Sequence, residues 1–416
     1  ASSAYGWQPT QTADLAASTV GLMQFAVAPG GDAMAVWTTP ETGIPQRLVG
    51  NYRSSSGAWW GAVSPINLAN ETVMRWAIDL SPTCTSEQTV VFTSFFDRNY
   101  PSSSTWNRTE VGRTGFQEGP AYAFCRGENT TVVWTAHDGV RLNLWVNKSV
   151  GGVWSGASLL ETSDFPVYAY TASADDAGDV IVAWSAANST AYDLVATVFV
   201  PGSGWSTPAA VTPRGNGFLF APPAVLVQPG GEAMAMWALP NATNGNDLLV
   251  SRFNPGAPWS TPEVATTVYG FSSFPLVRLA ADGLGRVRAV WMGTGSGPTL
   301  GIGTARSENG TWGYPEAVAS QANAIGRSLA AVVDAEGNAF VLWNRTSGAE
   351  YGAHIARYVE GIGWRAAEDV PPASEGASPL MDVQVGVDST GTPTFAWVEP
   401  QSPIERVVVR KYLPYN

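Results

Sequence analysis

The chain has 416 residues, of which 45% are hydrophobic and 13% are charged, and its formal net charge is −12. This composition supports a large buried core. No apolar run approaches the eighteen or so residues that a membrane-spanning helix needs. Lys148 and Lys411 are the two lysines, and no basic stripe occurs. The composition therefore argues against nucleic acid or an anionic membrane surface as the partner.

Short apolar runs that end in an aromatic residue recur along the chain at intervals of about fifty residues. Internal periods of this size are typical of propellers, solenoids or arrays. Because the repetition continues evenly, we expect one domain over residues 1–416. The aromatic residues that end the runs are Trp37, Phe92, Trp134, Trp184, Trp237, Trp291, Trp343 and Trp397.

Each repeat predicts four strands in a fixed order. A first apolar strand ends in a tight turn with Asp three residues before Gly, as in VDAEGNA from Val333, which suits a hairpin with a positive-φ glycine. The second strand is the nearly continuous apolar run, typical of a strand packed on both faces. The third alternates, as in HIARYV from His354. The fourth contains proline, as in GSGWSTPAAV from Gly202, which predicts an outer edge strand.

The chain ends predict how the repeats close into a ring. Residues near 6–15 resemble a fourth strand with no repeat before it, and residues near 380–412 supply a repeat that lacks its fourth strand. We therefore expect the first segment to complete the last blade of an eight-bladed β-propeller of four-stranded antiparallel blades. A seven-bladed ring is the alternative, because the second repeat is short and has Phe92 in place of tryptophan.

Most of the eighteen tryptophans fall in register within the second and fourth strands. A chain rich in tryptophan suggests sugar binding, because aromatic rings form platforms for sugars. The regular spacing instead assigns these residues to packing between blades.

The pattern VxDxxGxAxxxW followed by GxGWSxPxxL resembles the repeats of secreted bacterial or archaeal β-propellers that are loosely related to sialidase-like and lectin propellers. The sialidase box SxDxGxTW is not matched, since Trp343 lies six residues beyond Gly337. The arginine signature of sialidases and the docking motif of quinone-dependent dehydrogenases are also absent. The resemblance therefore implies a fold and no catalytic residues.

Two features predict a secreted or cell-surface glycoprotein. Cys84 and Cys125 occupy equivalent places in consecutive repeats, so we expect a disulfide between them; two unpaired buried thiols are the alternative. Eight Asn-x-Ser/Thr sequons are candidate glycosylation sites, and accidental matches in a threonine-rich chain are the alternative. The sequon asparagines are Asn70, Asn107, Asn129, Asn147, Asn188, Asn241, Asn309 and Asn344.

The sequence offers no catalytic constellation. Glycosidases need two carboxylates about 5–10 Å apart, and the carboxylates expected on the crossover face are spread singly around the ring. His137 is expected in a loop and His354 in an alternating strand, so neither suggests a Ser-His-Asp arrangement. Two cysteines and two histidines give no metal pattern, and we expect no metal or other cofactor.

Aromatic residues gather in the crossovers that precede the fourth, fifth and sixth repeats. If these segments project, they form an apolar sector for binding a partner. The alternative is that they fold inward and plug the axial channel. The candidate binding residues are Phe165, Tyr168, Tyr170, Phe218, Phe220, Tyr269, Phe271 and Phe274.

We therefore expect a non-enzymatic extracellular propeller that acts in adhesion or surface assembly. Its partner would be a surface protein, a glycan or copies of itself, with no nucleic acid and no membrane insertion. The alternatives are a carbohydrate-active hydrolase or lyase and a glycan-binding lectin.

Overall fold

The structure is a computed structural model of the whole chain. No helix in the described part of the chain is long and apolar enough to cross a membrane. The residues described are 6–9, 11–13, 20–21, 23–28, 30–41, 44–54, 64–66, 76–79, 88–92, 95–99, 106–110, 116–117, 121–126, 129–161, 166–187, 192–212, 222–243, 245–269, 276–292, 301–320, 328–345, 352–371, 381–401 and 404–413.

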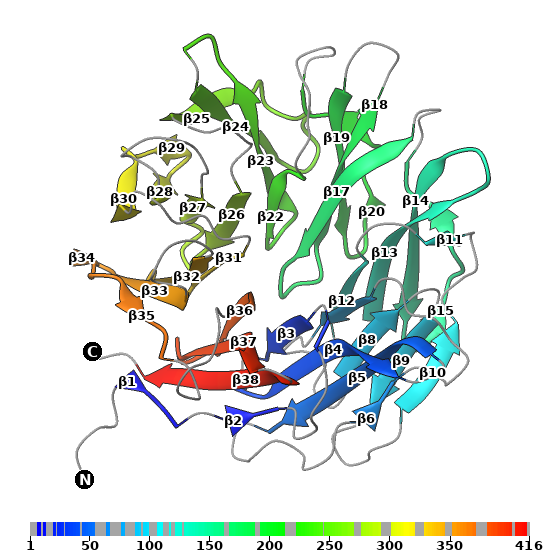
Figure 1. Ribbon diagram of the computed structural model, residues 1–416. Coiled ribbons are helices and arrows are strands. Elements are labelled where there is room, and N and C mark those ends of the chain that lie inside the picture. Colours follow the sequence, from blue (N-terminus) through cyan, green and yellow to red (C-terminus); the bar gives the residue numbers. More distant parts are fainter. Residues whose placement is uncertain are drawn as a thin grey trace.

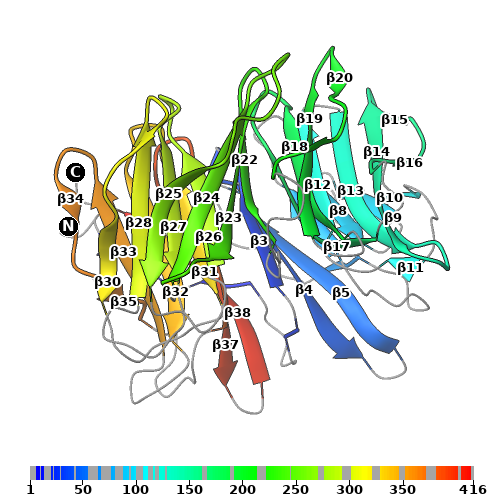
Figure 2. The ribbon, with the colours of Figure 1, turned by 90° about the horizontal axis from the view of Figure 1, so that it is seen from above.

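The described strands pair antiparallel into eight sheets, which stand side by side around a central axis (Figures 1 and 2). In seven of the sheets the strands follow one another in chain order from the axis outward, and the last sheet takes its outer strands from the N-terminal segment. The innermost strands contact one another in a closed circuit, β3–β7–β12–β17–β22–β26–β31–β36–β3. The protein is therefore an all-β propeller with antiparallel blades, as the repeats predict.

The first four sheets in chain order run through residue 210. Their strands are β3 (Met23–Val27), β4 (Ala33–Glu41), β5 (Ile44–Arg53) and β6 (Ser64–Pro65); β7 (Trp76–Asp79), β8 (Gln88–Phe92), β9 (Phe95–Asn99) and β10 (Trp106–Glu110); β11 (Phe116–Gln117), β12 (Tyr122–Arg126), β13 (Asn129–His137), β14 (Leu142–Val150), β15 (Val153–Trp154) and β16 (Ser158–Leu159); and β17 (Val167–Ala174), β18 (Val180–Ala187), β19 (Tyr192–Val200), β20 (Gly204–Trp205) and β21 (Ala209–Ala210).

The other four sheets follow, and the last of them includes the two N-terminal strands. Their strands are β22 (Ala224–Gln228), β23 (Glu232–Pro240), β24 (Gly245–Phe253) and β25 (Glu263–Tyr269); β26 (Leu276–Ala281), β27 (Val287–Met292), β28 (Gly301–Glu308), β29 (Thr311–Trp312) and β30 (Glu316–Ser320); β31 (Leu329–Val333), β32 (Ala339–Arg345), β33 (Gly352–Val359), β34 (Gly363–Trp364) and β35 (Glu368–Asp369); and β36 (Met381–Val387), β37 (Pro393–Gln401), β38 (Ile404–Leu413), β1 (Gly6–Trp7) and β2 (Gln11–Thr12).

The two ends of the chain join in the last sheet. Trp7 of β1 pairs with Tyr412 of β38, and Gln11 of β2 pairs with Val409. The N-terminal segment thus supplies the outer strands that the last repeat lacks, in the arrangement that the sequence predicts. This pairing covers an edge that would otherwise be open to other chains.

The short second repeat is the one that a seven-bladed ring would omit. It pairs as a four-stranded sheet of its own, β10–β9–β8–β7, in which Phe92 pairs with Trp76 on one side and Phe95 on the other. Its inner strand β7 contacts β3 and β12 of the neighbouring sheets.

The hydrophobic core lies in layers between adjacent sheets. One layer combines Ala35 and Trp37 of β4 with Ala396 and Val398 of β37, and the other layers follow the same plan. The second-strand tryptophans whose side chains are described are all buried, which confirms their role in blade packing. They are Trp37, Trp134, Trp184, Trp237, Trp291, Trp343 and Trp397.

The outer strands are broken where the proline-containing motif lies. In the fourth sheet, β20 and β21 pair separately with β19, and Ser206 lies between them. The Thr197 hydroxyl donates to the Ser206 carbonyl at 2.7 Å, so the side chain replaces a ladder hydrogen bond. Proline after this point leaves no inner ladder incomplete, because the strand lies at the edge.

Candidate functional site

One face of the propeller is built from the first-to-second and third-to-fourth strand turns, and we call it the turn face. The repeated Asp-x-x-Gly turn sets its shape. In the seventh sheet, Asp334 Oδ1 accepts the backbone N–H groups of Glu336 at 3.1 Å and Asn338 at 2.8 Å, while Gly337 takes a φ of 95°. The same carboxylate bonds recur at Asp175, Asp282 and Asp388. These aspartates therefore hold turns together.

Each third strand has one position, near the turn face, that often carries a cation. In the pairing of the second and third strands, this position is opposite the residue that comes three places before the aromatic residue of the second strand. Six of the eight third strands carry arginine or lysine there, although the whole chain is acidic. The six are Arg98, Lys148, Arg252, Arg306, Arg357 and Lys411, whereas the other two strands carry Tyr52 and Val198.

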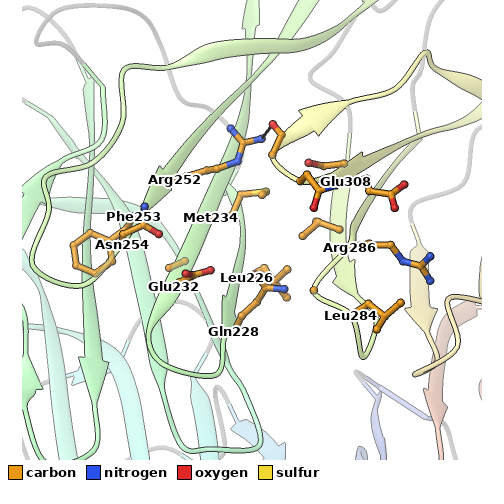
Figure 3. Close-up of a pocket in the computed structure, with 16 residues that line it drawn as sticks. Leu226, Gln228, Glu232, Met234, Arg252, Phe253, Asn254, Leu284, Arg286 and Glu308 are labelled. Atoms are coloured by element: carbon orange, nitrogen blue, oxygen red, sulfur yellow. Dashed lines mark hydrogen bonds between the residues drawn. The ribbon is translucent and has the colours of Figure 1, made fainter.

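Two of these cations line grooves between adjacent sheets. The polar groove, between the β22–β25 and β26–β30 sheets, has a volume of about 460 Å³ (Figure 3). Arg252 lies at its wall beside Phe253, whose ring packs 5.5 Å from Trp259. The polar groove is lined by Leu226, Gln228, Glu232, Ala233, Met234, Arg252, Phe253, Asn254, Leu284, Gly285, Arg286, Val287, Ser307, Glu308, Asn309 and Gly310.

The charges of the polar groove are largely paired. Arg252 forms an ion pair with Glu263 and donates at 2.8 Å to the Gly310 carbonyl on the other sheet. Arg286 pairs with Glu360 at 3.0 Å. Glu232, which also lines the polar groove, is exposed. The groove therefore combines an aromatic wall with donors and acceptors of both signs, a set that suits a neutral ligand rich in hydroxyl groups.

The apolar groove lies at the equivalent place between the β11–β16 and β17–β21 sheets and has a volume of about 500 Å³. Its walls include Phe124, Val180 and Phe199, and Lys148 occupies the cationic position. The apolar groove is lined by Phe124, Arg126, Asn129, Thr131, Lys148, Val150, Asp176, Ala177, Gly178, Val180, Phe199, Pro201 and Gly202.

Lys148 is half-buried in the apolar groove. Its Nζ lies 2.9 Å from the centroid of the Phe199 ring, a cation–π contact across the two sheets. Burial lowers the pKa of the Lys148 ammonium to about 8. No ion pair joins it to a carboxylate among the residues described.

The crossover aromatics were expected to form an apolar sector for binding. Tyr170 is the one of these candidates whose side chain is described, and it does not support this expectation. Tyr170 is 3% exposed and packs edge-on against Tyr122 at 5.4 Å, so its assignment to an exposed binding surface was wrong. Tyr170 lies in a core layer with Val133 and Leu144 of the neighbouring sheet, which covers its side chain. Tyr168 on β17 and Tyr269 on β25 lie in strands, and their side chains are not described. Phe165, Phe218, Phe220, Phe271 and Phe274 lie outside the described residues.

Two sequon asparagines are core residues, which contradicts their assignment as glycan carriers. Asn147 is 3% exposed and Asn344 is 4% exposed. Asn147 Oδ1 accepts the Lys148 N–H at 2.7 Å, and Asn344 Oδ1 accepts the Ser328 N–H at 3.0 Å. Their amides complete buried hydrogen bonding, so no glycan can be attached there in the folded protein.

The remaining sequons differ in their surroundings. Asn241 organises its own loop, because its Oδ1 accepts from Thr243 and Gly245 and its Nδ2 donates to Asp247. Asn129 and Asn309 are exposed, and they line the apolar and the polar groove respectively. Asn107 lies on β10 without a described side chain, and Asn70 and Asn188 lie outside the described residues.

Of the two cysteines expected to form a disulfide, the structure describes Cys125. Cys125 is fully buried on β12, and no cysteine in the described part of the chain is a free thiol. Its expected partner Cys84 lies outside the described residues, so the pairing stays a prediction.

The two histidines have structural contacts. His137, which was expected in a loop, is instead the last residue of β13, and its Nδ1 accepts the Gly139 N–H at 3.0 Å. His354 on β33 lies 2.8 Å from Asp369 and stacks on Trp343.

The crossover aromatics predicted binding on the crossover face, but both grooves lie at the turn face. The cationic register position was not predicted, because the third strands show only an alternating pattern when each is taken alone. The signal was present: in five repeats a lysine or arginine follows the strand tryptophan after about fifteen residues. Strand pairing was needed to show that these residues share one position.

No family model and no curated protein matches this sequence. Among solved structures, it is similar to the BP39L lectin from Burkholderia pseudomallei, with a TM-score of 0.53 and 15% identity over 94% of this chain and 99% of that one. A lectin of Aleuria aurantia in complex with α-methyl-L-fucoside has a TM-score of 0.42 and 12% identity, over 88% of this chain and 99% of that one. The α-L-arabinofuranosidase Arb93A of Fusarium graminearum has a TM-score of 0.42 and 13% identity, over 70% and 92%. At these identities the first likeness supports the β-propeller fold and nothing finer.

Proposed function

We propose that the protein is a carbohydrate-binding propeller that holds saccharides in grooves between blades and does not cleave them. The main support is that the same kind of groove recurs between different pairs of sheets. Two grooves of about 460 and 500 Å³ occupy equivalent places in the repeat, and each has a phenylalanine and a third-strand cation in its wall. Small-ligand sites span about 300–1,000 Å³ and combine apolar walls with a few polar groups.

Repetition of the groove suits a multivalent binder. We propose that each sheet is one blade of an eight-bladed ring and that several interblade grooves act together on one glycan-bearing surface. Weak single sites then give high avidity, because later binding events become intramolecular. An extracellular location is part of this proposal, and the absence of free thiols among the described residues agrees with it. The overall likeness to a lectin propeller is a supporting analogy.

The first experiment measures saccharide binding to protein made without N-glycosylation, because Asn129 and Asn309 line the grooves. A glycan array identifies saccharides, and calorimetry then compares wild type with Glu232→Gln in the polar groove. Loss of a charged hydrogen bond should weaken binding about tenfold. Glu368→Gln, at an exposed position on β35 away from the polar groove, is the matched control.

The competing class is a glycoside hydrolase, because Glu232 and Glu308 both line the polar groove and such enzymes use two carboxylates. Reducing-sugar release separates the two classes. Release that is abolished by Glu232→Gln or Glu308→Gln would establish an enzyme and overturn the proposal. Binding without release supports it, and no binding on the array contradicts it.

A further inference from the structure

The apolar groove holds a third-strand cation that pairs with no carboxylate among the residues described, whereas three of its counterparts on the turn face lie beside carboxylates. At the same register position, Arg306 pairs with Glu360 at 2.9 Å and Lys411 lies 3.9 Å from Asp388. Arg252 pairs with Glu263. Lys148 instead has the π-face of Phe199 as its charge contact.

The burial of Lys148 has a cost that a nearby anion would normally offset. Desolvation is the sole cause that lowers its pKa to about 8, so no neighbouring carboxylate stabilises the ammonium appreciably. A buried cation without an anion is unfavourable, whereas one that gains an anion in a dry groove interacts strongly. The groove thus has a place where a ligand carboxylate would be stabilised.

The other charges at the groove do not remove this preference. Arg126 from β12 faces the groove and lies 3.9 Å from Asp176 in the β17–β18 turn. The Asp176 side chain is 76% exposed, so its charge is screened by solvent. Arg126 also donates to the backbone carbonyls of Asp175 and Cys125, which fixes its guanidinium at the wall. Two fixed cations and one solvated anion leave the groove locally positive.

We infer that the apolar groove binds an acidic saccharide, whose carboxylate pairs with Lys148 and whose apolar ring face packs on the groove wall. This inference rests on the proposed carbohydrate binding and names the ligand class of one groove. The chain as a whole carries a charge of −12 and repels anions, so selection for an acid depends on this local group. Phe124 and Val180 supply the apolar wall. The polar groove, with its paired charges, takes neutral saccharides.

The sequence itself makes the test simple, because Lys148 and Lys411 are the two lysines of the chain. Labelled lysine therefore gives two side-chain signals by NMR, and Lys411 serves as the internal reference. D-Galacturonic acid is the probe, D-galactose is the neutral saccharide, and acetate is the carboxylate without a sugar. Galacturonic acid should shift the Lys148 signal and raise its pKa from about 8, while galactose should leave it unchanged.

Affinity provides the second readout. Because the bound carboxylate keeps the ammonium protonated, affinity for galacturonic acid should fall about thirtyfold between pH 6.5 and pH 9.5. Lys148→Met should weaken binding at pH 6.5 at least about tenfold and abolish this pH dependence. Lys148→Arg should keep the affinity and lose the pH dependence, and Lys411→Met should behave as wild type. The thermal unfolding of each variant shows that it is folded.

The outcomes separate this inference from the proposed function. Galactose binding that depends on Glu232, with no response of Lys148 to galacturonic acid, overturns the inference and leaves carbohydrate binding intact. A Lys148 response to galacturonic acid without saccharide binding in the polar groove supports the inference and restricts the function to this groove. Acetate that binds as tightly as galacturonic acid shows a general carboxylate site and overturns the assignment to a saccharide.

Discussion

The closure of the ring depends on a buried amide that links the N-terminal segment to the first sheet. Asn51 on β5 is 3% exposed, and its Nδ2 donates to the Ala13 carbonyl at 2.6 Å. Ala13 is fully buried, and its own N–H donates at 2.9 Å to Val407 of β38. Ala13 therefore connects the first and last sheets.

The variant Asn51→Ala removes this donor. It loses the buried hydrogen bond to Ala13, worth about 1 kcal/mol, and it leaves the Ala13 carbonyl buried without that partner, which costs about 1 kcal/mol more. It also removes Asn51 Oδ1, which accepts the Tyr52 N–H at 2.8 Å in both backgrounds tested below. We therefore expect the free energy of unfolding to fall by at least about 2 kcal/mol. Urea denaturation measures this change as a lower midpoint at an unchanged slope.

A deletion of residues 1–13 tests whether the cost belongs to ring closure. In the deleted protein, Asn51→Ala should cost at least about 1 kcal/mol less than in the full chain, because its partner is gone. Asn143→Ala, at a buried amide of the third sheet, should cost the same in both backgrounds. Equal costs for Asn51→Ala in the two backgrounds would refute the reasoning. If the deleted protein does not fold, faster hydrogen exchange of the Ala13 amide in full-length Asn51→Ala is the decisive measurement.

Three further variants test the turns and the cysteine. Gly337→Ala should lower the free energy of unfolding by about 2 kcal/mol in urea denaturation, because φ at Gly337 is 95° and the new Cβ would meet Arg286 and Asp282. The control Gly139→Ala also lies at positive φ, but its Cβ would enter open space, so it should cost about half as much. Hydrogen bonds from the backbone and Asn143 hold the pKa of Asp138 at about 2, so the NMR titration of Asp138 should have a midpoint near pH 2. In Asn143→Ala this midpoint should move upward. The stability that these hydrogen bonds add is present at neutral pH and is lost as the pH falls toward 2. Replacement of Cys125 by alanine should lower stability by about 2–4 kcal/mol if it closes the expected disulfide, and a native mass without the loss of two hydrogens would contradict that bond.

The sequence determined the architecture because its signals are local and repeated. Apolar runs that end in tryptophan specify buried second strands, as Trp184 and Trp397 show. The Asp-x-x-Gly pattern specifies a turn whose hydrogen bonds lie within five residues, as at Asp334. The missing fourth strand of the last repeat also predicted that the N-terminal segment completes the last blade, and Trp7 does pair with Tyr412 there.

Tertiary structure decided which side chains reach solvent and which meet across blades. Tyr170 and Asn147 have the residue types of surface sites, yet both are buried because neighbouring strands cover them. Lys148 resembles an ordinary exposed lysine in sequence, but its contact with Phe199 joins residues of two different sheets. Such groove chemistry depends on how neighbouring sheets pack against each other, and the pattern within any one repeat does not encode that packing.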